Sequence, residues 1–243
     1  MHKTGIEYGT YGWNPTIGCD NGPDICPVNQ ACWARGMAER GAGVYGTWPK
    51  GDRFAVRFLP ERLDEPKKEK RPGRVLVGFM GDLMCPGRPR LDILRVLRSI
   101  LDTPWHSFLC LTKNPGRYSE FPWPPNAWRG VTVTGAGDTD RIWALKDARI
   151  LMGDRYSWLS YEPALGPITG IVKTCAMDEI DWLVIGAQDR PRRDPKREWV
   201  EEAIEAAQKH GVAVFIKDNL AGLCAEWGLP VLRDYPEGMV GHK

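Results

Sequence analysis

The sequence of 243 residues contains no apolar run approaching the length of about 20 residues that a membrane-spanning helix needs. Its start also lacks the apolar stretch of a secretory signal. The formal net charge is only +2, so the overall charge neither requires nor excludes a polyanionic partner. We therefore expect a cytoplasmic protein with no membrane association. In that compartment thiols stay reduced, and clustered cysteines bind metal more often than they form disulfides.

Several other signatures are missing. No Gly-x-Gly-x-x-Gly sequence follows any predicted strand, which weakens the case for a dinucleotide-binding domain. There is no internal sequence repeat and no low-complexity tail. Hydrophobic residues make up 42% of the chain and charged residues 26%, which is ordinary for a globular protein with a sizeable core. We therefore treat residues 1–243 as a single domain.

What the chain does have is a cluster of cysteines near its start. Cys19, Cys26 and Cys32 have the spacing Cys-x6-Cys-x5-Cys in a loop over residues 14–34 that is rich in glycine, proline and asparagine. Three thiolates without a fourth ligand leave an open position on a metal centre, which usually serves chemistry. Structural zinc normally takes four ligands in two close pairs, and neither cysteine gap here is that short. From the spacing alone an iron–sulfur cluster, a zinc site and plain structural cysteines all stay open.

After this loop, short apolar runs alternate with helix-like segments. Most of the runs are continuously apolar, as expected for strands buried on both faces of a parallel sheet. The predicted strands are residues 8–14, 75–80, 106–111, 130–133, 156–160, 182–185 and 212–216. This alternation indicates βαβ units with right-handed crossovers. Six or seven units are too few for an eight-fold barrel. The predicted fold is therefore α/β, an incomplete (β/α)6-7 TIM-like barrel with an N-terminal cysteine loop, and a doubly wound open sheet is the alternative.

The spacing of apolar residues predicts the buried stripes of two helices. The first stripe consists of Leu91, Leu94, Leu97 and Leu101. The second consists of Val200, Ala203, Ile204 and Ala207. A third helix is predicted to begin near Asp138 and Thr139, which are suitable capping residues.

Two segments are rich in charge. Residues 47–74 form a charged insertion punctuated by prolines, and we interpret its charges as a solvated face. Residues 190–197 contain five basic residues just after a predicted strand. They either hold the phosphates of a nucleotide or nucleic acid or form a loop neutralised by Asp189, Asp194 and Glu198.

Ordered motifs along nearly the whole chain carry a family resemblance. They are Trp13-Asn14-Pro15, Gly18-Cys19, Cys32-Trp33-Ala34-Arg35, Gly81-Asp82-Leu83, and residues 111–117, 130–133, 159–167, 181–186 and 215–217. With these residues the chain resembles the radical S-adenosylmethionine (radical SAM) superfamily, and more narrowly a phage-type family within or close to it. One feature departs from the pattern. The superfamily loop is Cys-x3-Cys-x2-Cys and the phage-type loop closes with Cys-x2-Cys, whereas five residues separate Cys26 from Cys32.

The resemblance implies a [4Fe–4S] cluster on Cys19, Cys26 and Cys32, with S-adenosylmethionine bound to the fourth iron. One-electron reduction would cleave this cofactor to a 5′-deoxyadenosyl radical. An electron-donor protein is then an expected partner, and the preferred substrate class is a nucleotide or nucleic acid. The alternative is a non-catalytic zinc- or cluster-binding module on the same scaffold. The altered spacing supports this alternative, as does Gly81-Asp82-Leu83 where the superfamily has a Gly-Gly-Glu-like motif.

Ligand groups in such barrels come from the carboxyl ends of the strands. The polar residues at those ends are therefore the implied cofactor-binding set: Asp82, Lys113, Thr132, Thr134, Ser160, Glu162, Gln188 and Lys217. Asp82 is expected at the ribose or amino group of the cofactor, and Lys113 at its carboxylate. Trp33, beside Cys32, either covers the cluster and adenine or packs its helix on the barrel. For each polar residue the alternative is a capping or turn residue.

Overall fold

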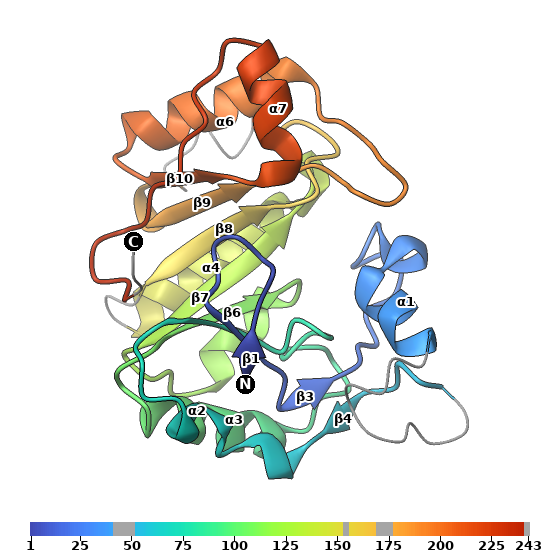
Figure 1. The fold of residues 1–243 in the computed structure, drawn as a ribbon, viewed down its shortest axis with the longest axis vertical. Coiled ribbons are helices and arrows are strands. Elements are labelled where there is room, and N and C mark those ends of the chain that lie inside the picture. Colours follow the sequence, from blue (N-terminus) through green and yellow to red (C-terminus); the bar gives the residue numbers. More distant parts are fainter. Residues whose placement is uncertain (41–51, 153–155, 169–176, 241–243) are drawn as a thin grey trace.

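The computed structural model describes residues 1–40, 52–152, 156–168 and 177–240 (Figure 1). These residues form a mixed α/β structure around one eight-stranded sheet with the order β1-β2-β5-β6-β7-β8-β9-β10. Neighbouring strands are parallel except for β1 and β2. The strands are β1 (His2–Lys3), β2 (Tyr11–Trp13), β5 (Arg74–Val77), β6 (Ser107–Thr112), β7 (Ala127–Val133), β8 (Ser157–Tyr161), β9 (Trp182–Ile185) and β10 (Ala213–Ile216).

The connections between the strands are mainly helical. The α-helices are α1 (Trp33–Glu39), α2 (Glu65–Lys68), α3 (Arg90–Leu101), α4 (Thr139–Met152), α6 (Arg197–Lys209) and α7 (Asp218–Glu226). Short 3-10 helices cover Asn29–Ala31, Pro60–Arg62, Pro115–Glu120, Ala136–Asp138 and Met177–Glu179. In the described ranges no helix is both long enough and apolar enough to span a membrane.

The parallel strands confirm the predicted α/β class. Each predicted run overlaps an observed strand, with ends displaced by a few residues. From β2 to β10 the strands of this sheet lie side by side in chain order. A doubly wound sheet requires a reversal of strand order at its switch point. No such reversal occurs among the described strands, so the doubly wound alternative is wrong.

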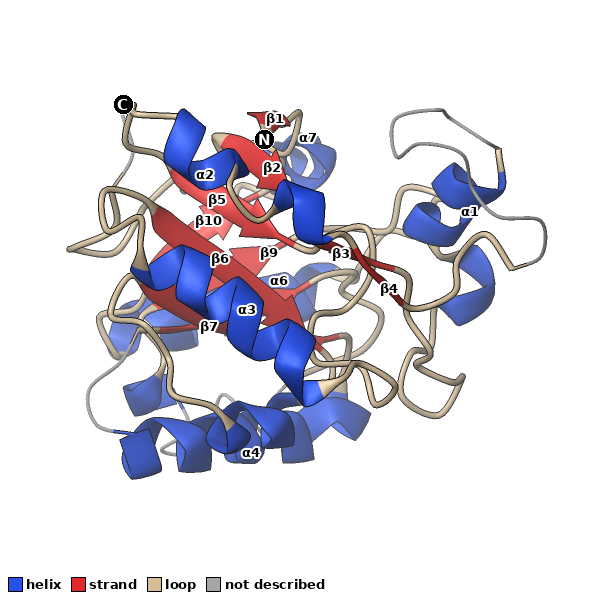
Figure 2. Ribbon diagram, turned by 90° about the horizontal axis from the view of Figure 1, so that it is seen from below, coloured by secondary structure: helices blue, strands red, loops and turns tan. Residues whose placement is uncertain are grey.

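Helices α3, α4, α6 and α7 pack on one face of the sheet. α3 and α4 lie against it in Figure 2, and α6 and α7 cover its β9–β10 end in Figure 1. Alternate residues of each strand point to this face, because successive side chains of a strand point to opposite faces. The strand residues of this core include Val75, Phe108, Val131, Leu159, Leu183 and Val214.

The opposite face, which we call the inner face, carries large aromatic side chains. An aromatic layer forms where Trp158, Trp182 and Phe215 surround Tyr8 from the N-terminal turn, and Trp128 belongs to the same buried cluster. The Tyr8 ring centroid lies 6.0 Å from that of Trp158 and 5.6 Å from that of Trp182, both edge to face. Figure 1 shows the N-terminal segment crossing in front of the central strands. This layer therefore fills the inner face with packed rings, which bury much apolar surface.

Helix α6 confirms its predicted stripe, since Val200, Ala203, Ile204 and Ala207 are all buried. The predicted stripe of α3 is confirmed only in part, because Leu97 is buried and Leu94 packs against the core, while the two outer leucines face solvent. Leu91 is 66% exposed and Leu101 is 47% exposed, whereas Ile93, Val96, Leu97 and Ile100 are buried. Both sets have helical spacing, so the leucines alone gave the wrong rotation of the helix about its axis.

The charged insertion has two parts, and residues 47–51 lie outside the described residues. Lys68, Lys70 and Arg71 are exposed, which confirms a solvated face there. The preceding part differs, because β4 (Arg57–Phe58) pairs with β3 (Thr16–Ile17) in a separate two-stranded sheet. The side chain of Phe54 is buried in a cluster with Ile17, Ala34, Ala38 and Met80. This part of the insertion supports the cysteine loop rather than facing solvent.

Candidate functional site

The carboxyl ends of the parallel strands meet along one edge of the sheet, and there the inner face changes from aromatic to polar. Along β8, Trp158 is followed two residues later by Ser160, and then by Glu162 just after the strand. Along β10, Phe215 is followed in the same way by Lys217. We call Thr132, Ser160, Glu162 and Lys217 the polar layer. It lies next to the aromatic layer on the same face, because residues i and i+2 of a strand point to the same side.

An ion pair between Glu162 and Lys217 forms part of the polar layer. The two side chains are only 18% and 14% exposed. A Cβ atom at Gly186 would lie 2.9 Å from Glu162 Cγ and 3.0 Å from Lys217 Cδ, so this glycine leaves room for the pair. Burial lowers the pKa of Lys217, but the Glu162 carboxylate raises it more, and the net pKa lies above the usual value. Lys217 therefore stays charged beside Glu162.

Asp82 organises the other half of the edge. The side chain is buried, and its Oδ1 and Oδ2 atoms accept hydrogen bonds from the ends of β5 and β6 and from the cysteine loop. The donors are Met84 N (2.8 Å), Thr112 Oγ1 (2.7 Å), Asn21 Nδ2 (2.9 Å), Lys113 N (3.1 Å) and Asn114 Nδ2 (3.1 Å). Both carboxylate oxygens are thus engaged within the protein. The predicted contact between Asp82 and a cofactor stays a prediction, and its role in holding the edge together is a new finding.

The cysteine loop begins in close backbone contact with the end of β5. Gly18 has a φ of 76°, in the left-handed region that favours glycine. It forms a parallel bridge with Gly81, where a Cβ atom would lie 2.2 Å from the Gly18 carbonyl oxygen. The buried Arg88 guanidinium donates to the carbonyls of Ile17 (3.0 Å) and Gly18 (3.3 Å). These contacts fix the backbone just before Cys19.

The three loop cysteines are free and partly exposed. The Asn21 amide donates to Cys19 Sγ at 3.4 Å. A hydrogen bond with the buried Cys85 thiol, together with burial, raises the pKa of Cys19. In the part of the chain that the structure describes, no three Cys, His, Asp or Glu side chains converge as ligands of one metal ion. The structure thus gathers the cysteines in one loop at the carboxyl edge, and their role as ligands stays a prediction.

The remaining predicted polar residues differ in whether their side chains are hydrogen-bonded within the protein. The side chains of Thr132 and Ser160 are buried on the inner face. Thr134 is engaged, because its amide and hydroxyl both donate to Asp138, at 2.7 and 2.8 Å. Gln188 is 9% exposed, and its Oε1 atom has no hydrogen-bond partner among the described residues. Of these residues, Gln188 alone presents a buried acceptor without a partner.

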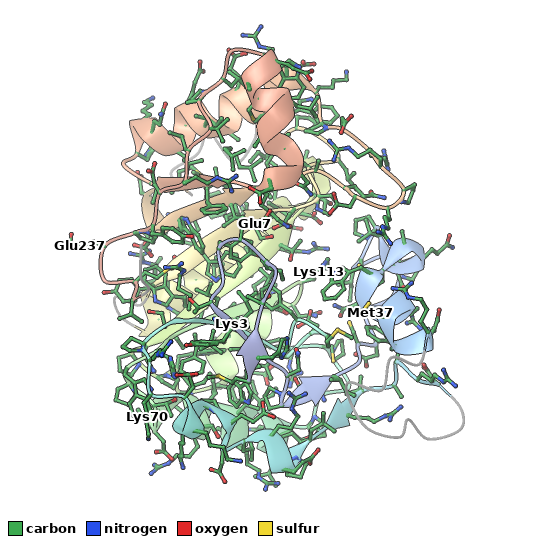
Figure 3. All side chains as sticks on the ribbon, viewed as in Figure 1. Lys3, Glu7, Met37, Lys70, Lys113 and Glu237 are labelled. Atoms are coloured by element: carbon green, nitrogen blue, oxygen red, sulfur yellow. The ribbon has the colours of Figure 1, made fainter. Side chains whose placement is uncertain are left out.

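Lys113 and Trp33 lie on the cysteine-loop side of the edge. The Lys113 backbone donates to Asp82, while its ammonium has no anionic partner among the described residues. Figure 3 places Lys113 on the side of the sheet that faces α1, the helix that carries Met37. Trp33 is 56% exposed, so it does not pack α1 onto the sheet. Ala34 and Ala38 of that helix are the buried residues.

A family model described as "Protein of unknown function (DUF5131)" matches residues 3–224. The chain belongs to the DUF5131 family. The match includes the cysteine loop and every strand from β2 to β10, so the whole carboxyl edge lies within the family's domain. Comparisons with curated proteins and with solved structures found no match.

The basic segment of this DUF5131 chain is largely neutralised by acidic neighbours. Arg192 pairs with Asp194 at 2.5 Å and with Asp189 at 3.8 Å. Lys196 and Arg197 pair with Glu198 and Glu201, at 3.9 and 3.1 Å. Only Arg190 and Arg193 have no acidic partner among the described residues. The ion-paired loop thus describes most of this segment better than a phosphate-binding patch does.

Three residues of the DUF5131 site were missed from the sequence. Asn21 and Asn114 bond each other at 2.8 Å, and both bond Asp82. Asn114 lies inside a family-like motif and Asn21 lies between two of the cysteines, so both could have been considered. Arg141 on α4 reaches the carbonyl of Ile25 in the cysteine loop. Nothing in the local sequence pattern pointed to that contact across 116 positions.

Proposed function

We propose that this DUF5131 protein is a radical SAM enzyme built on an incomplete α/β barrel. One observation carries the proposal: a loop with three free cysteines follows β2 and lies at the same edge as the polar layer. Six successive strands bring polar side chains to that edge, as expected for a barrel-type active site. Contacts of Tyr8 and Tyr235 with strands on the inner face support a curled sheet, since Tyr235 touches both Trp182 and Arg74.

The donor set fits an iron–sulfur cluster. Cysteine thiolates are the usual ligands of [4Fe–4S] clusters, and Cys19, Cys26 and Cys32 are free and partly exposed. The Asn21 amide already donates to Cys19 Sγ, and hydrogen bonds to sulfur tune such clusters. Around a single zinc ion the ligands must converge on one point. In a cluster, each cysteine binds a different iron atom.

When bound, the cluster and S-adenosylmethionine would supply reductive cleavage of the cofactor to a 5′-deoxyadenosyl radical. The chain's own residues would hold the cofactor and exclude water. Lys113 would bind the cofactor carboxylate, because its ammonium has no protein anion as partner. The unpartnered Gln188 Oε1 would accept a hydrogen bond from the cofactor, since burying it without a partner is costly.

The remaining predicted residues take two roles in this proposal. Thr132, Ser160, Glu162 and Lys217 would line the space beside the cofactor, and exposed Trp33 would cover the cluster. Asp82 and Thr134 would act mainly by fixing neighbouring backbone. An electron-donor protein would deliver the electron. Because such a centre is damaged by oxygen, the reducing cytoplasm is the compartment that we propose.

For the substrate we propose a nucleotide or nucleic acid, on the basis of two basic residues of this segment instead of all five. Arg190 and Arg193 are exposed and lack acidic partners among the described residues, and they follow β9 on the carboxyl side. Two guanidinium groups can contact phosphates. Affinity for single-stranded nucleic acid that falls steeply with salt would support this choice. Binding that is absent, or that survives in an Arg190→Ala/Arg193→Ala variant, would remove it.

The competing function is a non-catalytic zinc- or cluster-binding module. One observation favours it: both oxygens of Asp82, which follows Gly81 at the cofactor-motif position, are occupied by protein donors. In this alternative the metal would only hold the cysteine loop. Metal analysis separates the two, because a module of the zinc type would bind one equivalent of zinc and no sulfide.

The decisive experiment is anaerobic reconstitution of the full chain with iron and sulfide. We expect a brown protein with roughly four irons and four sulfides per chain. With a reductant and S-adenosylmethionine it should then form 5′-deoxyadenosine, measured by chromatography and mass spectrometry. The matched control replaces Cys19, Cys26 and Cys32 with alanine and should do neither. A protein that holds the cluster but never cleaves the cofactor would support the non-catalytic module, and one that takes up no iron would overturn the cluster itself.

A further inference from the structure

Each of the three loop cysteines lies next to a different anchor. Cys19 follows the bridge between Gly18 and Gly81 at the end of β5. Cys32 precedes α1, whose Ala34 is buried against the base of the loop. Cys26, in the middle of the loop, is far in sequence from both of these contacts. The backbone directly before it is also held by a contact from another part of the chain.

Arg141 of α4 provides that third anchor. Its guanidinium donates to the carbonyl of Ile25, directly before Cys26. The same group donates to the Thr132 carbonyl in β7 at 3.1 Å and pairs with Asp138 at 2.9 Å. Planar guanidinium groups hold several acceptors in fixed directions, which a lysine ammonium does not. Arg141 thus joins the middle of the cysteine loop to the carboxyl end of a central strand.

The residues around Arg141 restrict the movement of its contact with the Ile25 carbonyl. The side chains of Arg141 and Asp138 are only 13% and 10% exposed. Asp138 is held in turn by the Thr134 amide and hydroxyl. Hydrogen bonds to a charged group are stronger than those between neutral groups. The loop backbone at this point is also ordered locally, because the amides of Ile25 and Cys26 both donate to the Gly22 carbonyl, at 3.1 and 2.9 Å.

We infer that Arg141 is a positioning residue, which holds the backbone at Ile25 so that the Cys26 thiolate reaches the inorganic centre. The inference rests on the proposed function for its consequence, the retention of the centre. Its physical core, the tethering of the loop, does not depend on any bound group. The two can therefore be tested separately on the same variants.

The first test is hydrogen–deuterium exchange of the metal-free full chain. With Arg141→Met, amides in the peptide over residues 22–30 should exchange on the order of ten times faster, because a charge-assisted hydrogen bond to the loop is lost. The matched control is Arg149→Met on the same helix. Arg149 is 16% exposed and pairs with Asp181 at 2.9 Å, near the amino end of β8, where Ser157 also accepts from it. This variant should leave exchange in residues 22–30 unchanged.

The second test measures how fast an iron chelator removes iron from the reconstituted protein. Arg141→Met should lose iron several-fold faster than wild type, Arg141→Lys should be intermediate, and Arg149→Met should match wild type. Equal loop exchange in Arg141→Met and wild type, or equal acceleration by both methionine variants, would overturn the inference. If the wild type takes up no iron, the proposed function fails, while the exchange experiment still decides whether Arg141 tethers the loop.

Discussion

The aromatic layer and the polar layer lie on the same face of the same strands, yet they have opposite physical properties. Around Tyr8, the rings of Trp158, Trp182 and Phe215 are buried in edge-to-face or tilted contact. Two residues further along β8 and β10, this face carries Ser160 and Lys217. Buried aromatic surface stabilises a fold, whereas burying an ion pair gives little net stability.

This contrast indicates which region stabilises the fold and which region costs folding free energy. On the inner face, the strands before this edge carry a packed aromatic cluster. The carboxyl edge contains Asp82 with five donors, a Glu162–Lys217 pair and an unpartnered Gln188 Oε1 atom. Such groups are retained against their cost where a site needs them. Variants in the two layers should therefore separate stability from binding.

The largest expected effect is the loss of the iron–sulfur cluster that we propose for the cysteine loop. Cys26→Ala should reduce the iron content of the reconstituted protein to background, because a cluster held by two cysteines is not retained. Thermal stability of the metal-free chain should change little, since this side chain is partly exposed. The control is Cys110→Ala, a buried thiol in β6, which should keep its iron. A full cluster in Cys26→Ala would show that the ligand assignment is wrong.

Next in size is the loss of an aromatic ring. Trp158→Ala should lower the free energy of unfolding by about 3–5 kcal/mol, because a fully buried indole leaves a cavity. Ser160→Ala, two residues along the same strand, should change it by less than about 1 kcal/mol while weakening ligand binding. Denaturant unfolding of the metal-free proteins measures both. Similar destabilisation by the two variants would mean that the layers do not differ as we describe.

A smaller effect is expected at Asp82. Asp82→Asn turns one acceptor oxygen into a donor that faces other donors, and it should cost about 1–3 kcal/mol of unfolding free energy. Asp20→Asn is the control, because that exposed carboxylate accepts from the Gly87 amide alone among the described groups. It should stay within about 0.5 kcal/mol of wild type. Equal unfolding free energies for the two variants, measured by urea unfolding, would show that Asp82 does not hold this edge together.

The smallest effect concerns pH. The folded-state pKa of Lys217 lies above the usual lysine value of 10.5, so the folded chain binds this proton more tightly than the unfolded chain does. The stabilisation is fully present below pH 10.5 and is lost as the pH rises through the folded pKa. Lys217→Met should therefore show a shallower fall in unfolding free energy above pH 10.5 than wild type. Parallel curves for the two proteins would argue against the Glu162–Lys217 coupling.

Much of this architecture could be read from the sequence because it depends on local patterns. Apolar runs predicted the described parallel strands from β5 to β10, and the spacing in α6 predicted its buried face. The prediction for α3 was wrong at Leu91 and Leu101, which have the same helical spacing as the buried residues but face solvent. Only contact with the sheet selects between the two stripes. Residues such as Lys113 and Glu162 were identifiable because they follow strands whose carboxyl ends must meet.

Sequence patterns alone were enough to predict the succession of strands and helices, the cysteine loop and the polar residues at the strand ends. These follow from periodicity and from the order of residues along the chain. Only the tertiary structure decided that Asn21 and Asn114 share Asp82, that Glu162 pairs with Lys217 and that Arg141 reaches Ile25. Such contacts join residues that are 32 to 116 positions apart. Their geometry exists only once the sheet has brought its strand ends to one edge.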